Sequence, residues 1–291
     1  MCVSDRAGTR RERRAQRQRD PSRPRGPRRS VWRGPLPIAG TVVAVLVVVG
    51  VFVAISRAPA AAPAEPSPAV NSAVVSKVTS IPASVFDQVG AGTSTDIIHP
   101  APQGALLKGA SGKPLAVYVG AEFCPYCASE RWSFIVALSR FGTWKGLALS
   151  RSSSTDVFPN TATFTFRNAS YSSDYLELSA VETSDREGKP IASMTPVQDT
   201  AYAKLDSSQS IPFVDVGDRY FSVGAGYPPD VLSGKDWDAI ATALHDPTSP
   251  IAKAVIGHAN KWTAAICAVT GGQPGDVCSS PAVKGIQLPT K

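Results

Sequence analysis

Residues 115–141, LAVYVGAEFCPYCASERWSFIVALSRF, decide the fold of this chain. The stretch begins with an apolar run of β-prone residues, 115–119, which predicts a buried strand. The strand leads to Cys124-Pro125-Tyr126-Cys127, and the apolar residues that follow recur at helical spacing. Pro125 suits the first helical position, where its missing N–H costs no hydrogen bond. The sequence therefore predicts a strand that delivers a CxxC pair to the first turn of a helix.

The N-terminus of a helix favours thiolate chemistry at Cys124. Unpaired N–H groups and a partial positive charge stabilise an anion there. A thiolate is the attacking species in thiol–disulfide exchange, so Cys124 is the predicted nucleophile. Cys127 lies one helical turn further on, within reach of Cys124 for a disulfide. A CxxC pair also suits zinc ligation or a structural bridge, but zinc needs two more ligands nearby, and the strand and helix favour redox chemistry.

Positive charge is concentrated at the N-terminus. The chain has 291 residues with 30 basic side chains, and 12 of these are arginines within residues 1–36, beside three acidic residues. Residues 37–291 keep 18 basic and 20 acidic residues, so the folded part is nearly neutral and gives no indication of nucleic-acid binding. Residues 1–37 are rich in Pro and Arg, which predicts a disordered arm. Nucleic-acid-binding tails can have this composition as well.

An uncharged apolar run, IAGTVVAVLVVVGVFVAI, follows the arm at residues 38–55. As a helix it would extend about 27 Å at 1.5 Å per residue, close to the ~30 Å of a hydrocarbon core. The arginines before it predict a cytoplasmic N-terminus and an extracytoplasmic C-terminal domain. A cleaved signal peptide is the alternative, but the long basic region and the length of the run favour a retained anchor. The sequence thus predicts a single-pass protein of the cell membrane that contacts the lipid bilayer.

The remaining chain divides into a linker and one predicted domain. Residues 56–73 are rich in Ala and Pro and predict a semi-extended linker, and residues 74–291 predict the domain. Within it we expect a short helix broken at Pro82 and a turn at Gly142 and Gly146. Three further strands and three further helices are also predicted, and a cap residue is assigned to two of these helices. The strands are 147–150, 161–166 and 175–181; the helices are 197–205 capped by Thr195, 235–244 capped by Ser233, and 251–269.

A second motif lies at Ile211-Pro212. It begins two short strands around Gly217-Asp218, a pattern typical of a hairpin. A proline that begins a strand often marks a cis bond in a tight turn. Together with the upstream strand–CxxC–helix, this arrangement resembles the thioredoxin superfamily, in which a cis-proline loop lies against the disulfide. The resemblance implies that Cys124 is the nucleophile and that Cys127 is the resolving cysteine. It also implies that Pro212 is the cis-proline and that the backbone of Ile211 meets the substrate.

The spacing of the two motifs departs from a minimal thioredoxin. About 85 residues separate Cys127 from Pro212, against roughly half that number in the compact fold as the resemblance has it. We therefore expect an insertion at about residues 155–195. The predicted fold is α/β and thioredoxin-like, with an insertion between the CxxC helix and the cis-Pro strand, an N-terminal transmembrane helix and C-terminal helices.

Three motifs carry a closer resemblance. They are GAEFCPYCASERWSFIVALSRFG at residues 120–142, S-x-T-D-V-F-P-N-T-x-T-F-x-F at 153–166, and TAAICAVTGGQPGDVC at 263–278. In these motifs, and over about residues 74–281, the chain is similar to the domain-of-unknown-function 929 family. The resemblance to this family implies a thioredoxin-like protein that is typically anchored in a membrane. It does not indicate a physiological reaction.

The other cysteines have simpler interpretations. Cys267 and Cys278 are close in sequence, the first near the end of a predicted helix and the second in a predicted loop. In an oxidising compartment they predict a structural disulfide that holds the C-terminal tail. A second redox pair that relays electrons to the CxxC is the alternative. Neither cysteine follows a strand or begins a helix, which favours the structural role. Cys2 lies in the basic arm without a partner and is expected to be an incidental free thiol.

Several other side chains are weighed as site residues. Phe123 and Tyr126 border the thiols and are predicted to form an apolar collar for a peptide substrate. Glu122 is a candidate proton acceptor, although it and Lys113 suit solvated edges equally well. Trp132 is predicted to pack in the core. The histidines show no metal-ligand spacing and are assigned to ordinary surface or helix positions: His99, His245 and His258.

The sequence therefore predicts a membrane-anchored, extracytoplasmic thiol–disulfide oxidoreductase that uses its CPYC dithiol without a cofactor or metal. Its expected partners are protein thiols or disulfides and another membrane redox protein. Two rivals stay open. One is a scaffold or binding module whose CxxC is only a structural bridge. The other is a metallochaperone for a soft ion such as Cu(I), which the presence of only two methionines makes less favourable.

Overall fold

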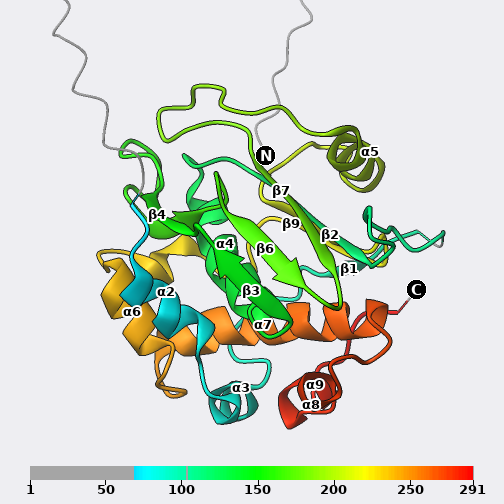
Figure 1. Cartoon of the computed structure of the whole chain (residues 1–291). Helices are drawn as coiled ribbons and strands as arrows, with labels where there is room; N and C mark the ends of the chain where they lie inside the picture. The colour runs from blue at the N-terminus through cyan, green and yellow to red at the C-terminus, as the bar shows by residue number, and fades with distance from the viewer. Residues whose placement is uncertain (1–68, 103, 291) are drawn as a thin grey trace, which may run out of the picture. The chain divides into compact units, whose positions relative to one another are not determined.

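The computed structural model describes residues 69–102 and 104–290 (Figure 1). The predicted arm of residues 1–37, the predicted anchor of residues 38–55, most of the predicted linker, and Cys2 lie outside the described residues. Among the helices of the described part, none combines the length and the hydropathy that crossing a bilayer requires. The topology derived from residues 1–55 stays a prediction.

The described residues form a mixed α/β structure. Its helices are α2 (Ser72–Thr79), α3 (Ala83–Val89), α4 (Pro125–Leu138), α5 (Pro196–Leu205), the 3-10 helix η1 (Pro229–Leu232), α6 (Trp237–Ala243), α7 (Pro250–Val269), α8 (Gly275–Cys278) and α9 (Pro281–Lys284). Its strands are β1 (His99–Pro100), β2 (Leu115–Gly120), β3 (Gly142–Lys145), β4 (Ala148–Arg151), β5 (Ala162–Thr165), β6 (Ser170–Ser173), β7 (Glu177–Glu182), β8 (Phe213–Val216) and β9 (Tyr220–Val223).

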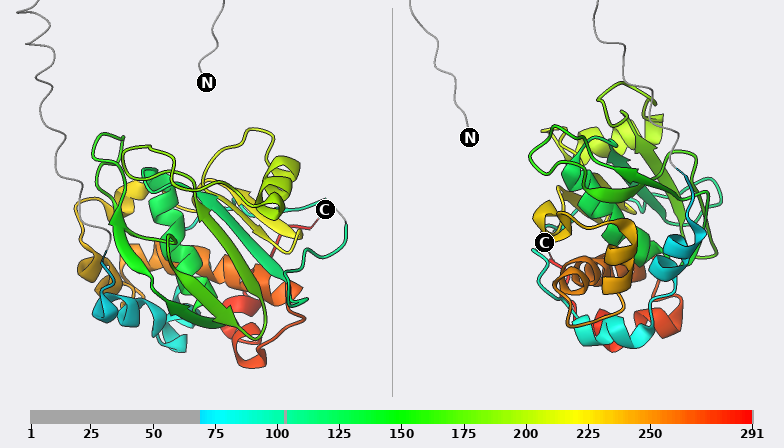
Figure 2. Two further views of the ribbon diagram at one scale, coloured as in Figure 1. Left: turned by 45° about the horizontal axis from the view of Figure 1, so that its top comes forward. Right: turned by 90° about the vertical axis from the view of Figure 1, so that its left-hand side faces the viewer.

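Strand β2 lies inside a five-stranded sheet of order β1-β9-β8-β2-β7. It runs parallel to β7 and antiparallel to β8, and β8 and β9 form the predicted hairpin. All six residues of β2 are buried because helices cover both faces. Leu115, Val117 and Val119 pack on the α5 side, whereas Ala116 and Tyr118 face the core formed with α4 and α7. Figures 1 and 2 show α5 and α7 on opposite sides of this sheet.

Helix α4 is buried along its whole length apart from Tyr126. On one side the Ser133 hydroxyl donates to the Val255 carbonyl of α7 across 2.9 Å. On another side the Trp132 indole donates to the Ala162 carbonyl of β5 across 2.8 Å, which confirms Trp132 as a core residue. A helix enclosed in this way must pair its polar side chains internally. Polar side chains of α4 close to the CxxC pair therefore have hydrogen-bond partners on the strands and helices that enclose the helix.

The segment between α4 and β7 differs from the sequence prediction. It forms two small antiparallel sheets, β3 with β6 and β4 with β5, whereas a turn was predicted at residues 142–146 and β6 was missed. Gly142 pairs with Ser173 in this sheet, and the position requires glycine because a Cβ there would stand 2.3 Å from the Ser172 carbonyl oxygen. The limits predicted for the insertion are also wrong. Residues 177–182 belong to the main sheet as β7, so the added strands precede β7.

The C-terminal helices need two corrections. Helix α6 begins after Asp236, whose carboxylate accepts from the Ala239 N–H across 2.8 Å, and not after Ser233. Aspartate caps a helix as well as serine does, so composition alone could not separate the two. The expected disulfide joins Cys267 of α7 to Cys278, but Cys278 ends the short helix α8 and does not lie in a loop.

Asp215 of β8 makes the stability of this sheet depend on pH. Burial, with the neighbouring Asp218, raises the pKa of Asp215 to about 7. The folded state therefore binds this proton more tightly than the unfolded chain, and stability should fall as pH rises from about 4 to about 7, by at most about 4 kcal/mol. Asp215→Asn keeps the oxygen that accepts from the Asp218 N–H. Urea denaturation across this window should show a flatter pH dependence in the variant, and equal slopes would contradict this assignment.

Candidate active site

The Cys124 sulfur caps helix α4. Cys124 is the N-cap residue, and its sulfur accepts a hydrogen bond from the Cys127 N–H across 3.3 Å. Pro125 occupies the first turn, as the sequence predicts. The Cys124 thiol also donates to the Ile211 carbonyl oxygen across 4.0 Å. The two motifs that lie 87 positions apart in the chain therefore meet at one sulfur atom.

The two thiols differ in exposure and in pKa. Cys124 is 7% exposed and Cys127 is fully buried. A hydrogen bond from Cys127 outweighs burial and lowers the pKa of Cys124 below its usual value. Burial raises the pKa of Cys127 well above its usual value, and the adjacent Cys124 raises it further. This difference favours the thiolate form at Cys124 over Cys127.

A buried ion pair lies beneath the thiols. Arg131 of α4, one turn after Cys127, contacts Glu182 at the end of β7, with Nη1 and Oε2 2.8 Å apart. Both side chains are essentially inaccessible to solvent. Arg131 also donates to the Ala121 carbonyl across 3.3 Å. Burial raises the pKa of Glu182, and the attraction of Arg131 opposes this rise. The positive charge of Arg131 lowers the pKa of both thiols, whereas Glu182 raises that of Cys127.

Other polar groups surround this pair. Tyr118 is fully buried on β2, and burial raises its pKa well above the usual value. Glu122 is 3% exposed and accepts from the Thr165 hydroxyl across 2.6 Å, so the solvated edge considered for it is wrong. Lys113 donates to the Ser173 carbonyl, at the opposite end of β2 from the thiols. Glu122 and Glu182 are therefore the carboxylates that the structure brings to the CxxC end of the sheet.

The loop before β8 presents Ile211 to Cys124. The Ile211–Pro212 bond is cis, as predicted. The Asp206 carboxylate holds the segment that precedes this bond, because it accepts hydrogen bonds from the N–H groups of Ser208 (2.9 Å) and Ser210 (2.6 Å). The position of the Ile211 carbonyl is thus held by local hydrogen bonds.

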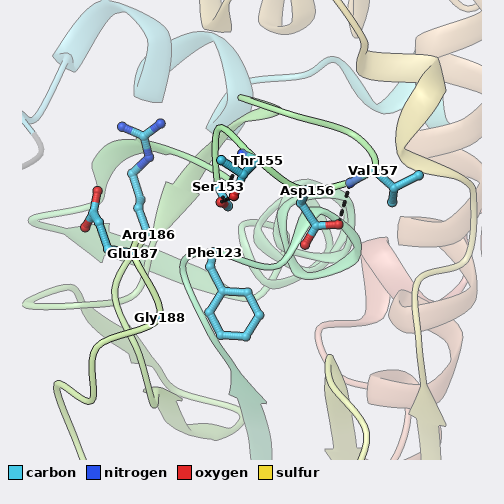
Figure 3. A pocket seen from close by; sticks show the side chains of 8 residues that line it. All are labelled: Phe123, Ser153, Thr155, Asp156, Val157, Arg186, Glu187 and Gly188. Carbon is cyan, nitrogen blue, oxygen red and sulfur yellow. Dashed lines mark hydrogen bonds between the residues drawn. The ribbon is translucent and has the colours of Figure 1, made fainter.

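Phe123 and Tyr126 lie on the outer side of the thiols. Tyr126 is 41% exposed and meets the Phe158 ring edge-on with centroids 6.0 Å apart. Phe123 lines a pocket of about 500 Å³, shown in Figure 3, with residues of two loops. The loop residues are Ser153, Thr155, Asp156, Val157, Arg186, Glu187 and Gly188. The predicted collar therefore continues into a pocket that the sequence analysis did not foresee.

A second buried polar cluster corrects the assignment of His258. His258 is fully buried on α7, with Nε2 3.0 Å from Oε2 of Glu130 on α4. The Trp262 indole donates to the same carboxylate across 2.5 Å. His258 is thus no ordinary surface or helix position. Among residues 69–102 and 104–290, no three His, Cys, Asp or Glu side chains gather as a metal site would require.

Sequence reasoning missed Glu130, Arg131 and Glu182. One signal could have found the first two: Glu130-Arg131 is a charged dipeptide that interrupts a helix otherwise rich in apolar residues. Charges at such positions are expected to be paired when the helix is enclosed. Glu182 offered no comparable signal. It is the last residue of a strand with alternating polarity, and an acidic residue in such a position usually faces solvent.

Comparison with known proteins adds one match. A family described as Domain of unknown function (DUF929) matches residues 109–201, which include β2, both thiols, α4 and β7. No curated protein and no solved structure matches the chain. The loop of Ile211 and the disulfide of Cys267 lie beyond the matched residues. The match supports assignment of the segment that carries both thiols to the DUF929 family.

Proposed function

We propose that this protein is a thiol–disulfide oxidoreductase with a thioredoxin-like fold, anchored in the cell membrane with its catalytic domain outside the cytoplasm. The observation that carries the proposal is the position of the Cys124 sulfur. It accepts the Cys127 N–H at the start of α4 and lies against the carbonyl before a cis-proline. A structural bridge has no need of a cysteine whose pKa is lowered at the start of a helix.

The order of the elements supports the fold assignment. Strand β2, helix α4 and strand β7 form a parallel β-α-β unit, and helix α5 leads to the antiparallel hairpin of β8 and β9. Helix α7 then covers the face of the sheet opposite α5. This succession is the one expected from the resemblance to thioredoxins, with β3 to β6 added between α4 and β7.

The reaction that we propose transfers two electrons between dithiols. The Cys124 thiolate attacks one sulfur of a substrate disulfide, forms a mixed disulfide, and releases the other substrate sulfur as a thiolate that takes up a proton. Cys127 then loses its proton and attacks the Cys124 sulfur. The second substrate thiol leaves, and the Cys124–Cys127 disulfide remains. The substrate disulfide is thereby reduced and the protein dithiol oxidised; the reverse sequence oxidises a substrate dithiol.

The proposed setting follows from the N-terminal sequence. The uncharged run of residues 38–55 would hold the domain at the membrane, and the arginines before it would stay in the cytoplasm. An extracytoplasmic compartment permits disulfides to persist, which suits the bond between Cys267 and Cys278. A second membrane redox protein would restore the resting oxidation state of the CPYC pair after each exchange.

The reduction potential of the Cys124–Cys127 pair tests the proposal. We expect a value between about −280 and −120 mV for the full chain equilibrated in glutathione buffers in detergent, because catalytic pairs fall in this range. Cys124 should be alkylated before Cys127, since it has the lower pKa and the greater exposure. Mass spectrometry of the alkylated peptides measures both, and it follows Cys267 and Cys278 separately.

A pair that stays oxidised below about −300 mV would contradict the proposal and favour the structural bridge of a scaffold module. Titration of the reduced chain with Cu(I) addresses the other rival. Binding of one ion by both thiols, together with no exchange activity, would favour the metallochaperone.

A further inference from the structure

The pocket beside Phe123 is built from two loops that are fixed to the CxxC segment. The Ser153 N–H donates to the Phe123 carbonyl across 2.8 Å, directly before Cys124. The Ser152 hydroxyl donates to the Phe158 carbonyl and accepts from the Thr161 N–H, which closes the first loop. In the second loop, the Asp185 carboxylate accepts from the N–H groups of Glu187 and Lys189. The Glu122 N–H donates to the Ser184 carbonyl across 2.9 Å, which joins this second loop to the segment before the CxxC. The pocket is therefore preformed and includes Phe123, the residue before Cys124.

The pocket has an apolar surface near the thiols. In the described part of the chain, the large apolar side chains that stand clearly exposed are Val70, Tyr126 and Val157. Val157, at 70% exposure, lines the pocket, and Tyr126 belongs to the CxxC itself. Exposed apolar side chains beside a concave surface are typical of sites that receive a ligand.

The charged side chains that line the pocket are two carboxylates, Asp156 and Glu187, and one guanidinium, Arg186, so the lining carries a net negative charge. Arg186 lines it, but its guanidinium donates to the Ser152 carbonyl and to Asn160 Oδ1, the latter across 3.0 Å. Glu187 is exposed, and its carboxylate has no ion-pair partner among the described residues. Among the described residues, the hydrogen bond that the Asp156 carboxylate accepts comes from the adjacent Val157 N–H. Figure 3 shows these two carboxylates on either side of Phe123.

We propose that this pocket binds a lysine or arginine side chain of the substrate polypeptide, close to the cysteine that reacts with Cys124. The aliphatic stem of such a side chain would lie on Phe123 and its charged end would reach Glu187, while Asp156 adds negative charge on the other side of Phe123. Long basic side chains combine an apolar stem with a cationic end, which matches this lining. The subsite rests on the proposed function and adds a substrate class to it.

Paired peptides test the subsite. The full chain, reduced in detergent, is mixed with short peptides whose single cysteine carries glutathione and whose neighbouring residue is Lys, Met or Glu. Formation of oxidised Cys124–Cys127 is followed by quenched-flow mass analysis. We expect the Lys peptide to react about two- to fivefold faster than the Met peptide at low salt, the range of an exposed charge pair. The Glu peptide should be the slowest, and 1 M salt should remove the differences.

Two variants with the same loss of charge separate the subsite from a general field effect. Glu187→Gln should lower the rate of the Lys peptide more than that of the Met peptide, so that the ratio of the two rates falls toward one. Asp174→Asn removes an exposed carboxylate between β6 and β7, at the far end of the main sheet. This control should leave all three rates unchanged. Equal Lys and Met rates, or an equal effect of both variants, would overturn the subsite.

A binding measurement keeps the two proposals separate. Peptides in which serine replaces the reactive cysteine are titrated into the same full chain. Tighter binding of the Lys peptide than of the Met peptide, lost in Glu187→Gln, supports the subsite even where no peptide is reduced. No reduction of any peptide would then count against the oxidoreductase alone. Equal affinities together with reduction of all peptides would count against the subsite alone.

Discussion

Cys127→Ala is expected to accumulate a stable mixed disulfide between Cys124 and substrate, whereas Cys124→Ala is expected to abolish exchange. The first variant retains Cys124, the more accessible of the two cysteines, which begins the proposed reaction, and removes Cys127, which completes it. The second retains only Cys127, whose pKa burial raises well above the usual value, so that its thiolate is scarce at neutral pH. Exchange by Cys124→Ala should fall to the rate of the uncatalysed reaction.

The measurement is turnover of a peptide disulfide, with trapped adducts identified by mass. The double variant Cys267→Ala/Cys278→Ala is the control. It removes the bond between α7 and α8 and should lower the free energy of unfolding by about 3 kcal/mol in the chain-entropy model. Its exchange rate should match that of the unmodified chain while it stays folded. Full turnover by Cys124→Ala would overturn the assignment of the nucleophile.

Arg131→Met is expected to lower the free energy of unfolding by about 3 to 5 kcal/mol, because it leaves the Glu182 carboxylate buried without its cation. Methionine fills much of the space of the arginine stem but supplies no charge. The double variant Arg131→Met/Glu182→Leu removes both charges and should recover most of the loss, since a buried ion pair exchanged for apolar groups is often neutral. Urea denaturation of the full chain in detergent compares the three proteins.

A second measurement distinguishes an effect on the thiols from an effect on folding. The Arg131 charge lowers the pKa of Cys124, so its loss should move the pH midpoint of Cys124 alkylation upward. The shift should persist in the double variant, even though its stability recovers, because the cation is absent there too. An unchanged midpoint in both variants would limit Arg131 to a structural role.

Local patterns in the sequence predicted much of the site. The β-prone run, Pro125 and the cysteine spacing predicted β2 and α4, because these features act over a few neighbouring residues. Thr195 and Pro196 likewise predicted the start of α5, where the threonine takes part in a capping box. The cis bond before Pro212 was implied by the resemblance to thioredoxins, because a proline at the start of a strand is by itself a weak signal of a cis bond. The predictions of β2, α4 and the start of α5 needed no knowledge of distant partners.

Predictions that depend on pairing were less accurate. The alternation of residues 175–181 indicated a strand, but nothing in it specified β2 as the parallel neighbour, and so β7 was assigned to an insertion. His258 and Glu130 were taken separately, although α4 and α7 bring them within 3.0 Å of each other. A strand or helix pattern reports which side of an element is buried. It does not report what lies against that side.

By itself, the sequence determined which residues are candidates for thiol chemistry: a CxxC at a helix start, where helix N–H groups can stabilise the first sulfur, and a proline at the start of a later strand. Only the tertiary structure decided how that chemistry is tuned. The buried pair of Arg131 and Glu182 acts on the thiols through space, and the pocket between two loops forms only when both are fixed to the CxxC segment. The reason is physical: hydrogen bonds of a helix cap are local, whereas desolvation and Coulomb interactions depend on which distant side chains the fold encloses together.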